Sequence, residues 1–216
     1  EEMAPTWDER GRIFLAEKGK ISTSPNGNGG WYSLLIRGGF GGLIEKEGIE
    51  WLNVYSVDNV LQRICDPVFV GATLVSGCNC SAKVVKKVSP EEKVGVLCME
   101  DGKPAIVEYY EMPQEIAAMR RPDGELKFFK VELLNKTIAE KLPVHLSFKK
   151  IPHIEDGKLV RPEQPNGYKF EYLVLDMIKL MGNCLAVEIE RDREFAPVKN
   201  KTGTDSVESA RALLVK

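Results

Sequence analysis

The chain has 216 residues, of which 43% are hydrophobic and 29% charged, and its formal net charge at pH 7 is −2. This composition is that of a folded globular protein, and the near-neutral charge, with Lys and Arg spread along the chain, argues against a nucleic-acid partner. No run of 18 apolar residues and no basic-then-apolar start is present, so we expect neither a membrane association nor a signal peptide, and we expect a cytoplasmic protein.

The five cysteines give no sign of a disulfide framework or a zinc site. Their number is odd, and Cys78 and Cys80 lack the spacing of zinc ligands. Reduced thiols in a reducing compartment are the expectation. The length suits one large domain or two small ones.

Strands and helices are expected to be mixed along the chain. In the first half of the chain, the patterns predict a short ribbon over 12–15 and 20–22, a helix from residue 31 through 41–48, a buried strand over 51–57, a short helix or turn over 68–75 and a strand over 82–88. A hairpin of 93–100 and 104–110, a short helix over 113–121 and an amphipathic segment over 132–141 follow. The last elements are a second hairpin around 155–157, a helix over 168–180, a strand over 184–189 and a helix over 205–214. The helix over 168–180 has its apolar residues on one face, namely Phe170, Leu173, Val174, Met177 and Ile178. An α/β sheet with a hairpin subregion follows.

The glycine-rich stretch after Ser24 is the first candidate binding site. Pro25 is followed by Asn26, Gly27, Asn28 and two further glycines, and then by an apolar helix start. Such a loop turns several backbone N–H groups toward one point, which favours a phosphate, and its bare backbone lets a base or a sugar lie against it. An ordinary flexible turn is the alternative.

Three charged residues are candidates for the chemistry. Asp58 follows a buried strand, where it is either a Mg²⁺ ligand or a solvated helix cap. Lys199 lies just after a proline in a polar segment and can neutralise phosphate charge, or it is a solvated loop lysine. Glu108 ends a hairpin strand, where it is either an acceptor for sugar hydroxyls or an exposed strand residue. His145 and His153 have no partner pattern and are assigned no catalysis.

Seven motifs in one order change the weight of these candidates. They are Ser24–Tyr32, Val54–Asn59, Asp66–Gly71, Ala82–Val85, Val94–Val96 with Val107–Tyr109, Pro165–Glu171 and Phe195–Asn200. Together they resemble the eukaryotic-type UDP-sugar pyrophosphorylases over nearly the whole chain, and within that family they are most similar to the UDP-N-acetylglucosamine pyrophosphorylases.

The resemblance implies a Rossmann-like, mainly parallel sheet of the nucleotide-diphospho-sugar transferase type, with hairpin insertions. It implies the reaction of UTP with a sugar 1-phosphate to give a UDP-sugar and pyrophosphate, with Mg²⁺, in a monomer or weak homo-oligomer. The roles it implies fall on residues that match the family's motifs: Pro25, Asn26, Gly27 and Asn28 on the uridine and ribose side, Asp58 on the metal and substrate, Ser81, Ala82, Glu108, Leu173 and Leu175 on the sugar side, and Lys199 as the catalytic contact to the phosphates.

The chain also departs from the family's pattern. Ser81 stands in place of a glycine, and Leu173 and Leu175 stand in place of two phenylalanines near the sugar. The family's upstream phosphate loop and its C-terminal domain have no counterpart in residues 1–216, which we therefore expect to be an incomplete central catalytic domain. Junctions at 36–42 and 126–130 read like places where residues have dropped out. The alternatives are a UDP-glucose or broad UDP-sugar enzyme and a non-catalytic sugar-nucleotide-binding homologue.

Overall fold

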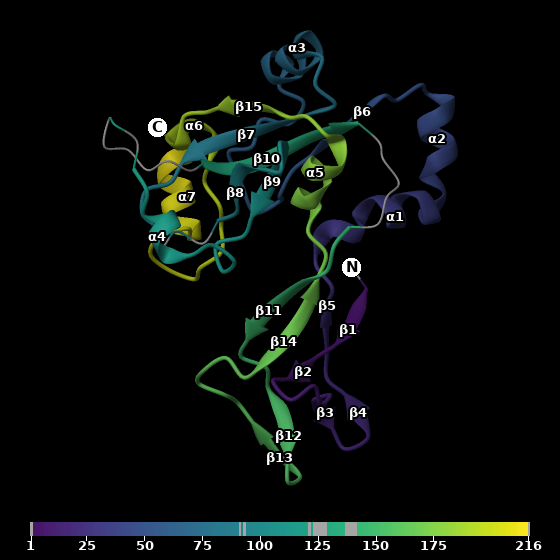
Figure 1. Cartoon of the computed structure of the whole chain (residues 1–216), viewed down its shortest axis with the longest axis vertical. Helices are drawn as coiled ribbons and strands as arrows, with labels where there is room; N and C mark the ends of the chain where they lie inside the picture. The colour runs from purple at the N-terminus through teal and green to yellow at the C-terminus, as the bar shows by residue number, and fades with distance from the viewer. Residues whose placement is uncertain are drawn as a thin grey trace. The chain divides into compact units, whose positions relative to one another are not determined.

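A computed structural model describes residues 2–90, 92, 94–120, 122, 129–136 and 142–215. The chain divides into two compact units (Figure 1). Unit 1 comprises Glu1–Gly48 and Ala139–Asp176, and unit 2 comprises Ile49–Ile138 and Met177–Lys216. None of the described helices is long and apolar enough to cross a bilayer.

Unit 1 is built from antiparallel strands. Its largest sheet has the order β11 (His145–Lys149), β14 (Gly167–Glu171) and β2 (Trp7–Asp8). Smaller pairs are β1 (Met3–Pro5) with β5 (Thr23–Pro25), β3 (Leu15–Glu17) with β4 (Lys20–Ile21), and β12 (His153–Glu155) with β13 (Lys158–Val160). The last two pairs confirm the predicted ribbon and the second hairpin.

The helical part of unit 1 follows the glycine-rich stretch, as expected. It runs through η1 (Asn28–Gly30), α1 (Trp31–Leu35), η2 (Ile36–Phe40) and α2 (Gly41–Lys46). The helix is kinked at Gly39, whose φ of +88° is left-handed. A left-handed residue interrupts a right-handed helix, so the helical path is broken within the junction over 36–42. Glycine adopts this conformation at little cost.

The prediction of a helix over 168–180 is wrong for its first half. Residues Gly167–Glu171 form β14, the middle strand of the sheet, and the helix α5 (Met177–Met181) begins only after the turn η3 (Val174–Asp176). A side chain at Gly167 would meet the Phe14 ring and the Trp7 carbonyl, and Tyr168 packs on Phe148 with ring centroids 4.9 Å apart. This tertiary packing outweighs the helical spacing of the apolar residues.

Unit 2 is centred on a four-stranded sheet of order β15 (Leu185–Glu188), β7 (Cys80–Lys86), β10 (Phe129–Lys136) and β6 (Trp51–Val54). Here β7 pairs with β15 in parallel, whereas β10 pairs antiparallel with both β7 and β6. The fold is therefore mixed α/β, as expected. A mainly parallel sheet is not confirmed, because β10 lies between β7 and β6 and runs against both.

Most other elements of unit 2 agree with the sequence patterns. They are the hairpin β8 (Val96–Glu100) and β9 (Lys103–Val107) and the helices α3 (Pro67–Ser76), α4 (Gln114–Ala117) and α7 (Val207–Leu214). The short helix α6 (Arg191–Glu194) was not predicted from the sequence. Helix α7 begins with a reciprocal Ser206–Ser209 capping box, which explains its sharp start. The predicted amphipathic segment begins within β10, and its residues 137–141 lie outside the described residues.

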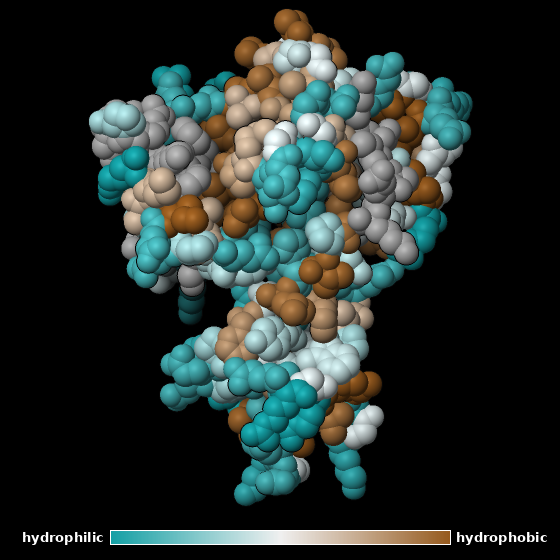
Figure 2. Space-filling model, in the orientation of Figure 1, coloured by the Kyte–Doolittle hydropathy of each residue, from teal (hydrophilic) through white to brown (hydrophobic). Residues whose placement is uncertain are grey.

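Helix α3 is apolar on nearly every side. Phe69 is buried against the sheet, but Val68 and Val75 are 78% and 90% exposed, and Figure 2 shows the resulting hydrophobic surface at the top of the view. A helix that is hydrophobic all round is ordinarily a buried one. This face of unit 2 is therefore unusually apolar for a surface.

Candidate functional site

The glycine-rich loop of unit 1 is hydrogen-bonded along the backbone of residues 172–174. Gly29 N–H donates to the Tyr172 carbonyl over 2.8 Å, and Tyr172 N–H donates to the Asn26 carbonyl over 2.7 Å. The Asn28 side chain accepts from Val174 N–H over 3.0 Å. Thus the structure joins the predicted nucleotide loop to the segment that carries Leu173.

The glycines of this loop are needed for that close approach. A Cβ at Gly27 would clash with the Tyr172 carbonyl oxygen and lie 3.0 Å from the Tyr172 backbone nitrogen. The φ of Gly27 is +83°, which is left-handed. A Cβ at Gly29 would lie 2.7 Å from both the Tyr172 carbonyl carbon and Leu142 Cδ1. The side of these glycines where a Cβ would stand therefore faces the chain itself, and any ligand must lie on the other side of the loop.

The remaining sequence-predicted residues of unit 1 flank this loop. Pro25 is exposed at the end of β5, and Asn26 accepts from Glu2 N–H over 3.0 Å through its side chain. Leu173 and Leu175 are half-buried, and Leu175 lies in η3. Tyr172 was not singled out from the sequence, because it contributes main-chain atoms that residue type does not reveal.

In unit 2 the structure brings Asp58 and Lys199 together. Asp58 Oδ2 lies 4.0 Å from Lys199 Nζ, and the side chains are 30% and 47% exposed. Val198 N–H donates to the Asp58 carbonyl over 2.9 Å, so the two segments are also joined through their backbones. A carboxylate and an ammonium that are close, partly exposed and only loosely paired are available to an external ligand.

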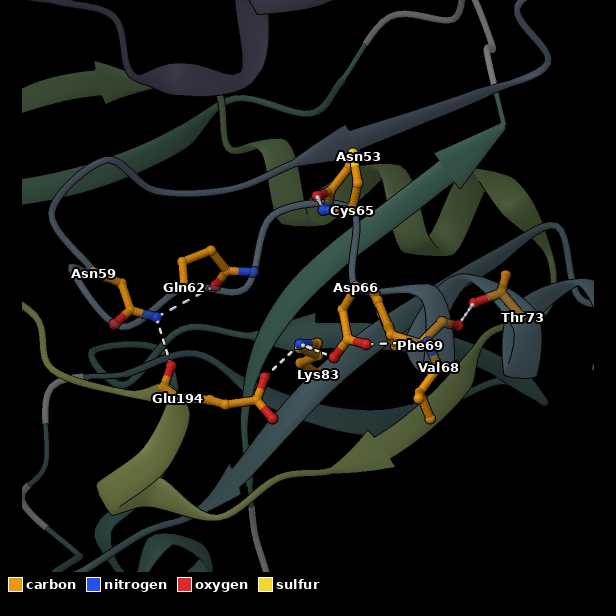
Figure 3. Close-up of polar contacts among 10 residues, drawn as sticks. All are labelled: Asn53, Asn59, Gln62, Cys65, Asp66, Val68, Phe69, Thr73, Lys83 and Glu194. Carbon is orange, nitrogen blue, oxygen red and sulfur yellow. Dashed lines mark hydrogen bonds and ion pairs between the residues drawn. The ribbon is translucent and has the colours of Figure 1, made fainter. Parts of the chain in front are cut away.

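Asn59 is the buried neighbour of this pair. Its Nδ2 donates to the Glu194 carbonyl over 2.9 Å and to Gln62 Oε1 over 3.3 Å (Figure 3). Its Oδ1 accepts from Ala196 N–H over 2.8 Å. An isolated β-bridge also joins Asn59 to Pro197. Sequence reasoning included Asn59 in a motif but gave it no role, although a buried asparagine needs partners of this kind.

Ser81 and Ala82, expected near the sugar, lie in the middle of the sheet. Both are fully buried in β7, which has β15 on one side and β10 on the other. The Ser81 hydroxyl is hydrogen-bonded to the Thr73 hydroxyl of α3. The Ser81 side chain thus holds α3 on the sheet.

Glu108 follows β9 and lies over Gly95. A Cβ at Gly95 would lie 3.1 Å from Glu108 Oε1 and 2.8 Å from Ile106 Cγ2. Since Gly95 makes room for this carboxylate, it is a second residue that the sequence offered within a motif but without a role.

A buried ionic cluster joins strand β7 to the start of helix α3 and to helix α6. Lys83 of β7, with a side chain only 2% exposed, pairs with Asp66 Oδ2 over 3.1 Å and with the Glu194 carboxylate (Figure 3). Asp66 also caps α3 by accepting from Val68 N–H over 3.0 Å. Burial raises the pKa of Asp66, but the Lys83 ammonium and the helix N–H groups lower it, and the net shift is downward from 3.8. The signal in the sequence is a lysine within a buried strand, which requires compensation.

We expect Lys83→Met to lower the free energy of unfolding by about 3–5 kcal/mol, because it leaves two largely enclosed carboxylates, 12% and 13% exposed, without their cation. Urea unfolding at pH 7 measures this. Lys86→Met on the same strand removes a half-exposed partner 3.6 Å from Glu188 and should cost roughly 0–1 kcal/mol. Equal costs would contradict the assignment. The contribution of Lys83 to the free energy of unfolding should be complete above the ordinary Asp pKa. It should be lost as the pH falls through the lowered pKa of Asp66.

The predicted site residues therefore form two groups. Asn26, Gly27 and Asn28 gather with Leu173 in unit 1, and Asp58 pairs with Lys199 in unit 2. Ser81, Ala82 and Glu108 also belong to unit 2. Among the described residues, no group of three or more His, Cys, Asp or Glu side chains could hold a metal ion.

Comparison with known proteins gives strong matches along the whole chain. It is 40% identical to human UDP-N-acetylhexosamine pyrophosphorylase-like protein 1, over 98% of this chain and 44% of that protein. It is 34% identical to Saccharomyces cerevisiae UDP-N-acetylglucosamine pyrophosphorylase, over 98% of this chain and 48% of that protein. The chain thus spans about half the length of these relatives. The match to the human protein extends over 227 residues, more than the 216 here, so that relative has residues that this chain lacks.

Solved structures show the same relationship. A crystal structure described as a putative UDP-N-acetylglucosamine pyrophosphorylase from Entamoeba histolytica superposes with a TM-score of 0.83 at 30% identity, over 99% of this chain and 56% of that one. Residues 2–214 match the family described as UTP–glucose-1-phosphate uridylyltransferase. The chain belongs to this uridylyltransferase family.

Proposed function

We propose that the protein containing this chain transfers the uridylyl group of UTP to a sugar 1-phosphate, with N-acetylglucosamine 1-phosphate as the first sugar. The observation that carries the proposal is the Asp58–Lys199 pair, a partly exposed carboxylate and ammonium 4.0 Å apart in a member of this family. The yeast and Entamoeba relatives, named for N-acetylglucosamine, support the choice of sugar.

In the proposed reaction an oxygen of the sugar phosphate attacks the α-phosphorus of UTP. The new P–O bond forms as the bond from the α-phosphorus to the bridging oxygen breaks, and pyrophosphate leaves with that electron pair. No general base is needed, so the protein contributes mainly position and charge. The Lys199 ammonium, half-exposed and loosely paired, neutralises charge that builds up on the phosphate oxygens.

Asp58 is the residue that would hold a divalent cation, for which we propose Mg²⁺. Its carboxylate is partly exposed and is not locked into a close ion pair. One carboxylate is a sufficient protein contribution for Mg²⁺, which takes its other ligands from phosphates and water. When bound, the ion supplies further neutralisation of phosphate charge.

We assign the uridine and ribose to the free side of the loop formed by Asn26, Gly27 and Asn28, with Pro25 at its entry. For the sugar we propose Glu108 of unit 2 as an acceptor for its hydroxyls. Leu173 and Leu175 of unit 1 are proposed as sugar-side residues from the family's pattern. Ser81 and Ala82 match the same pattern, but their side chains are buried and β7 is paired on both sides, so we assign them no direct contact. The leucines that replace two family phenylalanines leave glucose 1-phosphate, or several sugars, as the second candidate.

We expect Gly95→Ala to raise the KM for the sugar 1-phosphate about tenfold, because the new methyl group displaces the Glu108 carboxylate and one lost hydrogen bond is worth roughly 1 to 1.5 kcal/mol. The KM for UTP should not change. Gly71→Ala, where the added carbon meets nothing within 4 Å, is the control. Steady-state kinetics with both substrates varied measures this, and a KM rise for UTP alone would count against it.

We also propose that residues 1–216 are an incomplete catalytic domain of a Rossmann-like type, acting in the cytoplasm as a monomer or weak homo-oligomer. The coverage of about half of each relative and the exposed apolar face of α3 support an incomplete domain. The kink at Gly39 and the longer match to the human protein support missing internal residues. An intact mass near 24.1 kDa for the natural protein would contradict it.

The proposed activity is tested with the full natural polypeptide, UTP, Mg²⁺ and a panel of sugar 1-phosphates. We expect pyrophosphate release, fastest with N-acetylglucosamine 1-phosphate. Faster release with glucose 1-phosphate would select the second sugar. No release with any sugar, together with measurable UDP-sugar binding in a calorimeter, would favour the non-catalytic homologue.

A further inference from the structure

We infer that Asn59 is a positioning residue whose side-chain amide fixes the register between Asp58 and Lys199. The inference rests on the proposed function for its catalytic consequence, but its structural part stands without it. The carboxylate and the ammonium lie on segments 140 residues apart in sequence, and Asn59 is the buried side chain that spans them.

The amide bonds the opposite segment through both of its ends. Its oxygen accepts from Ala196 N–H over 2.8 Å, and its nitrogen donates to the Glu194 carbonyl over 2.9 Å. A buried amide satisfied in both directions fits only one register of the partner backbone, because a shift by one residue would put donor against donor. Only two residues, Pro197 and Val198, separate Ala196 from Lys199.

Backbone bonds on either side of Asn59 carry this register outward. Val60 N–H donates to the Ala196 carbonyl over 3.3 Å, and Val198 N–H donates to the Asp58 carbonyl over 2.9 Å. The partner segment is itself anchored, because the Glu194 carboxylate pairs with buried Lys83 (Figure 3). Asn59 thus joins a rigid support to the segment that carries Lys199.

A matched asparagine separates this role from ordinary stability. Asn53 of β6 also holds a loop, since its Oδ1 accepts from Cys65 N–H over 2.8 Å (Figure 3). Its bond holds the loop at Cys65 rather than residues 194–199, and Asn53 has no place in the proposed site. Asn59→Ala removes two side-chain bonds to backbone and Asn53→Ala removes one, and only the first variant should change the Asp58–Lys199 geometry.

The first experiment is amide hydrogen exchange on the unliganded chain. In Asn59→Ala we expect the Ala196 and Val198 amides to exchange about tenfold faster or more, and in Asn53→Ala we expect this at the Cys65 amide instead. Unchanged exchange at Ala196 and Val198 in Asn59→Ala would overturn the inference, whether or not the protein proves to be a uridylyltransferase.

The second experiment is kinetic, on the full natural polypeptide. We expect Asn59→Ala to lower kcat about 100-fold through misplacement of Lys199, with KM values within about threefold, and Asn53→Ala to leave kcat unchanged at a matched loss of Tm. Equal kcat in the two variants would overturn the catalytic part.

If Asn59→Ala does not fold, Asn59→Asp keeps the volume and the acceptor but loses the donor to Glu194. Wild-type kcat in Asn59→Asp would overturn the same part, and a loss above about tenfold would support it. Absence of turnover in the wild type would refute the proposed function and leave the exchange result standing.

Discussion

Lys199→Ala is expected to lower kcat for uridylyl transfer about 100- to 1,000-fold, since one preorganised charge contact to the reacting group is worth roughly 3–4 kcal/mol. The lysine is half-exposed and its nearest partner, Asp58 Oδ2, is 4.0 Å away. Lys199 therefore contributes little to the stability of the fold, and its charge is available to a ligand. The measurement is pyrophosphate release under saturating substrates, with the Tm of each variant as a check on folding.

Lys201→Ala is the matched control for this effect. Lys201 is an exposed lysine two residues further along the same loop, and we expect its removal to leave kcat unchanged. A Tm for Lys199→Ala near the wild type would confirm that the loss is chemical. Should Lys199→Ala retain full turnover, Lys199 does not contact the transferred phosphate.

Gly27→Val is expected to abolish UTP binding and to destabilise unit 1 by about 3 kcal/mol or more. Two effects add. The φ of +83° at Gly27 disfavours any β-branched side chain, and the new Cβ would collide with the Tyr172 carbonyl, which accepts the Gly29 N–H bond. Displacing that carbonyl breaks the contact between the loop and residues 172–174. Calorimetric titration with Mg²⁺ and UTP, alongside thermal unfolding, measures both losses.

Gly30→Ala is the control for Gly27→Val. A Cβ at Gly30 meets nothing within 4 Å, and its φ of −73° is helical, so we expect no loss of stability. Wild-type affinity of Gly27→Val for UTP would refute the loop assignment. Wild-type stability with lost affinity would instead show that the ligand, and not Tyr172, occupies the space beside Gly27.

The sequence predicted most local elements, because their signals are local. The hairpin around Asp101–Gly102, the strand at β7 and the capped helix α7 all follow from turn residues, apolar runs and caps. It failed at β14, where apolar residues at helical spacing belong to a strand. There the decisive contacts come from Trp7 and Phe14, about 155 residues upstream, which no local pattern contains.

The candidate site was predicted in the same uneven way. Asp58 and Lys199 were identified by residue type and by family motif, and the structure places them together. Asn59, Lys83 and Gly95 lay inside the same motifs without a role, since their contributions are a two-sided amide bond, a buried ion cluster and an empty space. Such contributions depend on neighbours distant in sequence. Residue type signals only that a buried Asn or Lys must have found some partner.

The parallel pairing of β7 with β15 has a consequence for biosynthesis. Both neighbours of β7 follow it in the chain, β10 after about fifty residues and β15 after about a hundred, so during translation the edge that pairs with β15 stays open longest. A strand with an unpaired edge invites aggregation, and β7 is buried along six of its seven positions in the finished protein. The nascent chain should therefore bind a holdase chaperone until residue 188 has cleared the exit tunnel, and ribosome profiling of chaperone-bound chains would locate that interval.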